Sequence, residues 1–158
     1  MNETELGFLG SIVYLGIVIV GTLAGHLYLR FNSKLLTLIA LVLLEGTLGL
    51  FVLSDQKWTA YVSRFLIGAF QVFLLVYYPV WIDKFGQDKK TLWLTLLQIC
   101  VPVGIFAGYG MTAAVLSLGQ TYLVSFYLQI GIVAIFIIGF AFVPKDKLDC
   151  RREDDHHE

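Results

Sequence analysis

The sequence predicts an all-α membrane protein with five transmembrane helices. Of its 158 residues, 58% are hydrophobic and 15% are aromatic, and its mean hydropathy of +0.78 is well above that of a soluble chain. Five apolar runs reach the roughly 20 residues that a helix needs to cross a bilayer. Almost nothing is left over for a soluble domain, so we expect an integral, multi-pass membrane protein.

Charged residues bound most of the five runs and set the expected spans, which cover about 7–29, 35–53, 58–82, 91–117 and 120–143. The first span ends before Arg30, and the second starts after Lys34. The third lies between Lys57 and Asp83. The fourth starts after Lys90, and the fifth ends before Lys145. The spans form a transmembrane bundle over residues 1–143. A charged tail follows over residues 144–158.

The lysines and arginines predict how the spans are oriented. Nine of the 11 follow the first, third and fifth spans, whereas Lys57 is alone on the opposite side and Arg64 lies inside a span. By the positive-inside rule, the loops at 30–34 and 84–90 and the tail lie in the cytoplasm. The acidic start MNETELG has no positive n-region or cleavage site, so we infer that one upstream helix is absent from this chain. Both the plasma membrane and an endolysosomal membrane fit these features.

The sequence indicates neither an enzyme nor a nucleic-acid-binding protein. Its 11 basic and 12 acidic residues nearly balance, and no basic stripe is interleaved with aromatic residues. It has no nucleophile–base constellation, phosphate-binding loop or His/Cys ligand spacing, so no cofactor or metal is expected. Cys100 lies in a span and Cys150 in the tail, so they cannot pair. We expect Cys150 to be a free thiol at the surface, with palmitoylation as the alternative.

Two residues that are normally charged at neutral pH lie inside the expected spans, where charge is costly. Glu45 is near the middle of the second span, and Arg64 is in the third. If these spans form a hairpin that turns at residues 55–56, the two residues differ in depth by ~3 Å. An ion pair is therefore one expectation. The alternative is that Arg64 extends to the membrane interface while Glu45 is protonated.

Polar residues recur on one face of each of two spans. The third span carries Arg64, Gly68, Gln71, Leu75 and Tyr78, and the fourth carries Gln98, Pro102, Tyr109 and Thr112. Steps of three and four place residues on one face of a helix, and lipid does not favour a polar face. We expect both faces to line a cavity. The alternative is that they hydrogen-bond helices to one another.

Small residues and prolines indicate where helices approach or bend. Glycine pairs occur at Gly21 and Gly25, at Gly46 and Gly49, and at Gly104 and Gly108, and such pairs let backbones come close. Pro102 removes a backbone donor in mid-span, which predicts a kink or a hinge. The candidate packing or hinge positions are Gly68, Pro79, Pro102, Gly104 and Gly108.

Three stretches resemble signatures of the major facilitator superfamily. They are GHLYLRFNSK at 25–34, RFLIG at 64–68 and PVGIFAGY at 102–109. The last of these, together with YYP at 77–79 and Asp83, is most similar to the spinster-like branch. The resemblance covers nearly the whole chain. It implies that the five spans are helices two to six of a twelve-helix transporter, a partial six-helix half of that fold.

The resemblance also implies a function. Transporters of this superfamily are secondary active transporters that work by alternating access between two halves, and spinster-like proteins are proton-linked exporters of lysophospholipids, sphingoid lipids and related small organic molecules. The implied substrate-cavity residues are Arg64, Gln71, Tyr78, Gln98 and Tyr109. The implied cytoplasmic gate loop includes Gly25, Arg30 and Lys34.

The chain departs from the family pattern at three positions. The loop signature usually has Asp at the position of Leu29 and Gly at the position of Asn32. Spinster-like proteins typically have Glu at the position of Gln71. Because a glutamine does not titrate, Glu45 becomes the candidate for proton coupling.

Together these features predict a fragment or truncated form of a transporter for lipids or small organic solutes. Its expected partners are membrane lipids, the substrate, and either a complementary transporter half or a second copy of the chain. The alternative is a non-transporting membrane protein that associates with partner helices through its glycine faces.

Overall fold

The computed structural model describes residues 3–53 and 56–150. It contains five long helices and two short 3-10 helices, which are α1 (Glu3–Arg30), α2 (Ser33–Val52), α3 (Lys57–Phe85), η1 (Gln87–Lys89), α4 (Lys90–Ser117), α5 (Tyr122–Phe142) and η2 (Lys145–Lys147). The described residues include no strand. All five long helices are long and apolar enough to cross a bilayer. The predicted class, an all-α integral membrane protein with five spans, is confirmed.

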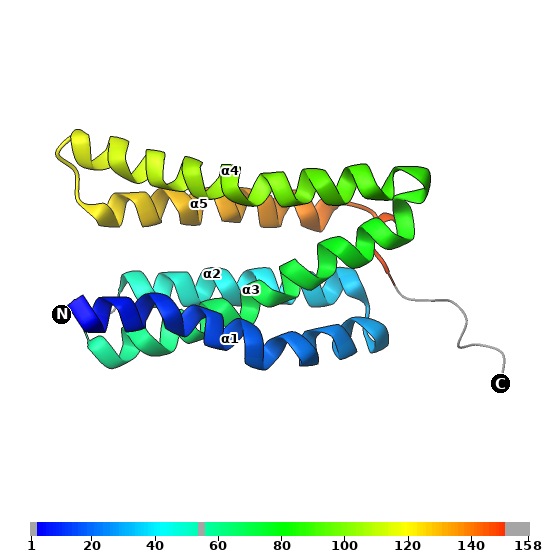
Figure 1. Ribbon diagram of the computed structural model, residues 1–158, viewed down its shortest axis with the longest axis horizontal. Coiled ribbons are helices and arrows are strands. Elements are labelled where there is room, and N and C mark those ends of the chain that lie inside the picture. The colour runs from blue at the N-terminus through cyan, green and yellow to red at the C-terminus, as the bar shows by residue number, and fades with distance from the viewer. Residues whose placement is uncertain (1–2, 54–55, 151–158) are drawn as a thin grey trace.

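The five helices form two layers (Figure 1). α1, α2 and α3 lie together in one layer, and α4 and α5 form an antiparallel pair in the other. α3 packs against both α1 and α2, and α5 packs against α2. The α1–α2 turn and the α3–α4 turn lie at the same end of the bundle (Figure 1). By the bounds of these helices, that end carries Arg30, Lys34, Lys84 and Lys90, and we call it the basic end. The end that carries Lys57 is the opposite end.

Two glycines set the closest approach of α1 and α3. A Cβ atom on Gly16 would meet the carbonyl oxygen of Phe65 and would lie 2.9 Å from the nitrogen of Ala69. A Cβ atom on Gly68 would meet the carbonyl oxygen of Val13. Only a hydrogen atom fits at either position, so the two backbones pack directly on each other.

The other glycine motifs do not mark close crossings within the described residues. A Cβ atom on Gly21 would lie 3.5 Å from a methyl of Val72, which is ordinary contact. The positions at which a Cβ atom would meet nothing within 4 Å include Gly25, Gly46, Gly49, Gly104 and Gly108. The glycine pair Gly21 and Gly25 of the first span is therefore not where α1 and α3 approach most closely.

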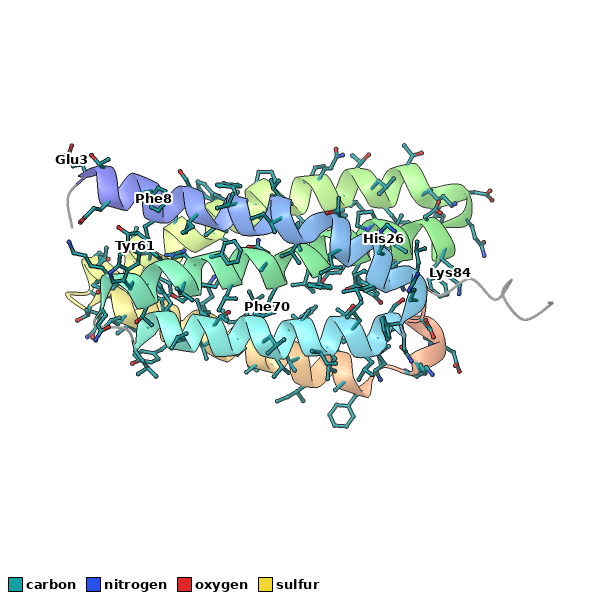
Figure 2. All side chains as sticks on the ribbon, turned by 90° about the horizontal axis from the view of Figure 1, so that it is seen from below. Glu3, Phe8, His26, Tyr61, Phe70 and Lys84 are labelled. Carbon is teal, nitrogen blue, oxygen red and sulfur yellow. The ribbon has the colours of Figure 1, made fainter. Side chains whose placement is uncertain are left out.

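Aromatic and charged side chains close the opposite end between α1 and α3. The rings of Phe8 and Tyr61 pack edge to face with centroids 5.6 Å apart. Figure 2 shows both residues near one end of the bundle and His26 and Lys84 toward the other end. Lys57 pairs with Glu5 at 3.0 Å. Because this ion pair is partly exposed, its contribution to stability is about 0–1 kcal/mol.

Local chemistry explains the start of α2 and the path of α3. The side chain of Asn32 caps α2 by accepting hydrogen bonds from the N–H groups of Lys34 and Leu35 at 3.0 and 3.4 Å. Pro79 lies inside α3 and Pro102 inside α4, and neither has an N–H for the helix ladder. Toward its end, α3 runs obliquely from the first layer to α4 (Figure 1).

The buried core gathers toward the basic end. The cluster comprises Ala24, Tyr28, Ala40, Val72, Phe73, Tyr77, Leu148 and Cys150. Cys150 is only 9% exposed, so the expectation of a surface thiol is wrong. The reason is that the segment after α5 folds back against α1–α3 and carries Cys150 into their core. Residues 151–158 of the expected tail lie outside the described residues.

Candidate functional site

Arg64 lies in α3 two turns from its start and is half-buried. Its guanidinium carbon is 4.2 Å from the centroid of the Phe51 ring on α2. Phe51 in turn packs against Phe126 on α5, with ring centroids 5.4 Å apart. A guanidinium over an aromatic face is attracted by the negative π-cloud. This stack of three side chains therefore connects α3, α2 and α5.

The expected ion pair between Arg64 and Glu45 is not formed. Both carboxylate oxygens of Glu45 and the Nε of Arg64 are buried without a hydrogen-bond partner in the described part of the chain. Arg64 contacts Phe51 instead, six residues beyond Glu45, which is ~9 Å along a helix. Its side chain thus extends toward the opposite end, as expected of a long cation that approaches the membrane interface.

The polar face of α3 divides into packed and exposed positions. Gly68 is buried under α1. Gln71 and Leu75 are exposed, and Tyr78 is half-buried against the core, with its ring 5.7 Å from that of Tyr77. The face therefore presents one amide and one apolar side chain away from the core.

The polar face of α4 lies outside the packed core. Gln98 and Pro102 are exposed, and the side chain of Tyr109 is 76% exposed. The hydroxyl of Thr112 donates to the carbonyl of Gly108 in its own helix at 3.0 Å. Since this bond is intrahelical, it does not join α4 to another described helix.

The expected gate residues occupy the turn between α1 and α2. α1 ends at Arg30, which is exposed, and α2 begins at Ser33. Lys34 donates through Nζ to the carbonyl oxygens of Ala141 and Val143 at 2.9 and 2.7 Å. Those carbonyls are at the end of α5, where a helix leaves acceptors unsatisfied and its dipole favours a cation. Lys34 thus attaches the start of α2 to the end of α5.

One buried polar contact was missed by the sequence analysis. The hydroxyl of Tyr28 lies 2.8 Å from the hydroxyl of Thr37 and donates to the carbonyl of Phe73 at 3.1 Å, which joins α1, α2 and α3. Tyr28 precedes the turn at residues 31–32 by three positions, and Thr37 follows it by five. Their similar depth in a helical hairpin is the signal that could have revealed the contact.

Phe51 was also missed as a partner for Arg64. It is one of 12 phenylalanines in the chain. The sequence does not distinguish it from its apolar neighbours, because only the crossing of α2 and α3 places its ring under the guanidinium.

Comparison of the sequence with known proteins assigns the chain to a family. The chain matches the Major Facilitator Superfamily over residues 1–155. It is similar to Protein spinster homolog 3 of Danio rerio, with 28% identity over 118 residues that cover 73% of this chain and 24% of that protein. It is also similar to Probable sphingolipid transporter spinster homolog 1 of Arabidopsis thaliana, with 27% identity over 153 residues that cover 94% of this chain and 30% of that protein.

The chain therefore spans about a quarter to a third of the length of these relatives. No solved structure matches it significantly. The resemblance to the spinster-like branch is confirmed, at low identity. Because the family match covers nearly the whole chain and the helices have the length and apolarity that membrane spans require, this chain belongs to the Major Facilitator Superfamily.

Proposed function

We propose that the chain is part of a secondary active transporter that moves lipids or small organic solutes by alternating access. Membership of a transporter superfamily supports this function over catalysis of a reaction. A sphingoid-like or lysophospholipid substrate is supported by the similarity to a relative named a probable sphingolipid transporter. Because the chain spans 30% of that relative's length, a complementary half or a second copy completes the substrate site.

The observation that carries the proposal is the state of Arg64. A cation inside a span is costly and marks a functional position by default. The guanidinium is stabilised by the Phe51 ring, and its Nε has no hydrogen-bond partner among the described residues. Its fork of N–H donors suits a phosphate or carboxylate headgroup. Arg64 is thus the proposed binding group for the polar head of an amphiphilic substrate.

Gln71 and Leu75 extend this proposed site toward the basic end. They follow Arg64 by two and three turns of α3, or ~10 and ~16 Å at the helical rise, and both are exposed. An amide followed by an apolar side chain suits an amphiphile whose headgroup contacts Arg64 and whose chain lies along α3. Tyr78, Gln98 and Tyr109 remain proposed contributors to the same path.

Glu45 is the proposed proton-coupling group. It is an acid in the middle of α2 and its oxygens have no hydrogen-bond partner in the described chain. Gln71, at the position where spinster-like proteins typically have a glutamate, cannot bind or release a proton in transport. Glu45→Gln is therefore expected to abolish uptake driven by a pH gradient while leaving counterflow exchange of substrate intact.

Reconstitution tests the proposal. The purified chain in liposomes is expected to transport no lysophospholipid as a monomer, and to do so saturably with the six-helix second half of a spinster-like transporter. Arg64→Met should then reduce uptake by about 10- to 100-fold, which is the effect of losing a charge-assisted hydrogen bond of 1.5–3 kcal/mol. Gln71→Ala should reduce uptake less.

Two variants at the opposite end serve as matched controls. Lys57→Met removes a cation from a partly exposed ion pair, and Gln120→Ala removes an exposed amide in the loop between α4 and α5. Both are expected to transport as the unmodified chain does. Saturable uptake by a chain shown by crosslinking to be monomeric would contradict the need for a partner. Equal uptake by Arg64→Met and Lys57→Met would contradict the role of Arg64.

A second function is favoured by one feature of α4. Gly104 and Gly108 lie four apart in this exposed helix, and a Cβ atom on either would meet nothing within 4 Å. This small-residue face suits close contact with a helix of another chain. A non-transporting protein that binds partner helices would show Gly108→Leu abolishing its association with partners and no uptake with any second half.

A further inference from the structure

The segment that follows α5 crosses the basic end and docks against α1–α3. We call residues 143–150 the strap. Val143 and Pro144 are extended, η2 follows, and Leu148 and Cys150 enter the buried core at 8% and 9% exposure. Figure 1 shows this segment leaving α5 and passing toward the ends of the first layer.

Side chains at the ends of α2 and α3 bind the main chain of the strap. The donors are Lys34 to the carbonyl of Val143 at 2.7 Å, Tyr77 to that of Leu148 at 3.1 Å, Trp81 to that of Lys147 at 2.8 Å and Lys84 to that of Asp149 at 3.1 Å. The N–H of Cys150 donates to the hydroxyl of Ser33 at 3.2 Å. Five hydrogen bonds therefore hold the strap in one path across the helix ends.

The strap is one of the attachments between α5 and the first layer. At the opposite end, Phe126 of α5 packs against Phe51 of α2. At the basic end, Lys34 and the strap make the connection, together with the ring of Phe140 on α5, which packs edge to face on Tyr77 of α3 with centroids 6.1 Å apart. Among the described residues, Val115 is the buried residue of α4 and Ser125 that of α5. The α4–α5 pair is thus little buried along its length and is tied near its two ends.

The two parts of the docked strap differ in how firmly they are held. At its end, the hydrogen bond to the carbonyl of Leu148 and the one from the N–H of Cys150 are buried. Residues 144–147 are exposed, and the hydrogen bonds from Trp81 and Lys84 are exposed as well. Each such bond contributes little net free energy because water competes for both partners. Ordering the strap opposes docking through lost conformational entropy. The exposed middle of the strap is therefore its least stable part, and release of the whole strap must also uncover Leu148 and Cys150.

We propose that the strap is a releasable latch, which when docked holds the basic end of α5 on α2 and α3. Its release lets the α4–α5 pair tilt away from α1–α3 at that end, while Phe126 stays packed on Phe51 at the other. The latch belongs to the fold of this chain and does not depend on what the chain transports. Its state controls whether the basic end is closed.

The thiol of Cys150 reports directly on the latch. The chain has two cysteines, so Cys100→Ser leaves Cys150 as the sole thiol. Burial excludes reagents from Cys150 and raises its pKa, and both effects slow alkylation because the thiolate is the nucleophile. In the folded chain, N-ethylmaleimide should react with Cys150 much more slowly than with a free thiol.

Removing a latch donor should speed this reaction. Trp81→Phe and Lys34→Met are each expected to raise the alkylation rate about two- to tenfold, the population change that one lost hydrogen bond produces. Trp58→Phe and Lys57→Met are the same substitutions at the opposite end, and they should leave the rate unchanged. Thermal unfolding in detergent verifies that each variant is folded. Equal alkylation rates of Cys150 in the latch variants and the control variants would contradict the latch proposal.

A distance measurement tests the tilt itself. Spin labels on His26→Cys of α1 and Phe142→Cys of α5, both exposed, are introduced with Cys100→Ser and Cys150→Ser. Combining Trp81→Phe with Lys34→Met should add a population of longer distances by pulsed electron resonance. The control pair, Trp58→Phe with Lys57→Met, should not add such a population. Identical distributions in both backgrounds would show that the strap does not hold α5 and would overturn the proposal.

Discussion

The guanidinium of Arg64 lies 4.2 Å from the centroid of the Phe51 ring, in the last turn of α2. An aromatic face offers a cation favourable electrostatics without a counter-charge. This contact explains how α3 tolerates an arginine inside a span without using the acid on the neighbouring helix. The Nε of Arg64 has no hydrogen-bond partner among the described residues, which leaves this donor for the proposed ligand.

Double-mutant cycles distinguish the two possible partners of Arg64. We expect Arg64→Met and Phe51→Leu to be non-additive in unfolding free energy by about 0.5–2 kcal/mol, the range of cation–π contacts. Arg64→Met and Glu45→Gln should be additive, because the two side chains make no ion pair with each other. Thermal unfolding of the four variants of each cycle in detergent provides the measurement. Strong coupling to Glu45 would contradict the observed geometry.

At the scale of helices, the crossing of α1 and α3 depends on Gly68. Gly68→Ala should lower the unfolding free energy by about 1–3 kcal/mol, as overpacking does, because its Cβ atom would meet the backbone of Val13. Gly49→Ala is the control, since a Cβ atom there meets nothing within 4 Å. It should be neutral or stabilising, because alanine favours a helix over glycine by about 1 kcal/mol. Equal melting temperatures of the two variants would refute this crossing.

The start of α2 depends on the side chain of Asn32. Asn32→Ala should destabilise the protein by about 1 kcal/mol and speed amide exchange at residues 34–35, because two N–H groups lose their acceptor. Asn32→Asp keeps an acceptor oxygen and should retain stability. Asn32→Gly restores the residue of the family pattern and should cost only a few tenths of a kcal/mol. If all three variants melt alike, the cap contributes nothing.

At the scale of the whole molecule, orientation in the membrane is the first quantity to measure. Gln56→Cys and Gln87→Cys exchange the same residue type at the opposite end and at the basic end. With Cys100→Ser and Cys150→Ser in both, a membrane-impermeant maleimide added to intact cells should label position 56 and spare 87. This follows from nine lysines and arginines on one side against Lys57 on the other. The reverse labelling would invert the predicted topology.

The positions of the spans could be predicted from the sequence because the bilayer requires an apolar side chain at nearly every position of a span. Apolarity over about 20 positions is a local property, and it indicated all five long helices. Hydropathy reports only the part within lipid, however. α1 begins at Glu3, before the expected span at residue 7, since Glu3 and Glu5 suit the first turn of a helix whose dipole favours acids. α3 likewise continues past residue 82 to Phe85.

The partners of individual side chains were not accessible in the same way. The depth argument for Glu45 and Arg64 assumed side chains that point straight across a hairpin, whereas Arg64 extends along the helix to Phe51. The strap was missed because its bonds use main-chain carbonyl and N–H groups, which are not specific to any residue type. Only Leu148 and Cys150 have side chains buried in the core, and two such residues in a charged segment do not form a pattern.

The burial of Leu148 and Cys150 also bears on the order in which the protein folds. Their cluster includes Ala24 and Tyr28 of α1, so contacts that complete the core span well over a hundred positions of sequence. Synthesis releases the amino-terminal part first. The five helices can therefore enter the bilayer one after another, yet the core between them stays incomplete until the chain is made through residue 150. If synthesis stopped just after α5, the helices would be inserted but Tyr28 and Tyr77 would lack the cover of Leu148 and Cys150. Cellular quality-control proteins could then recognise these uncovered side chains at the basic end.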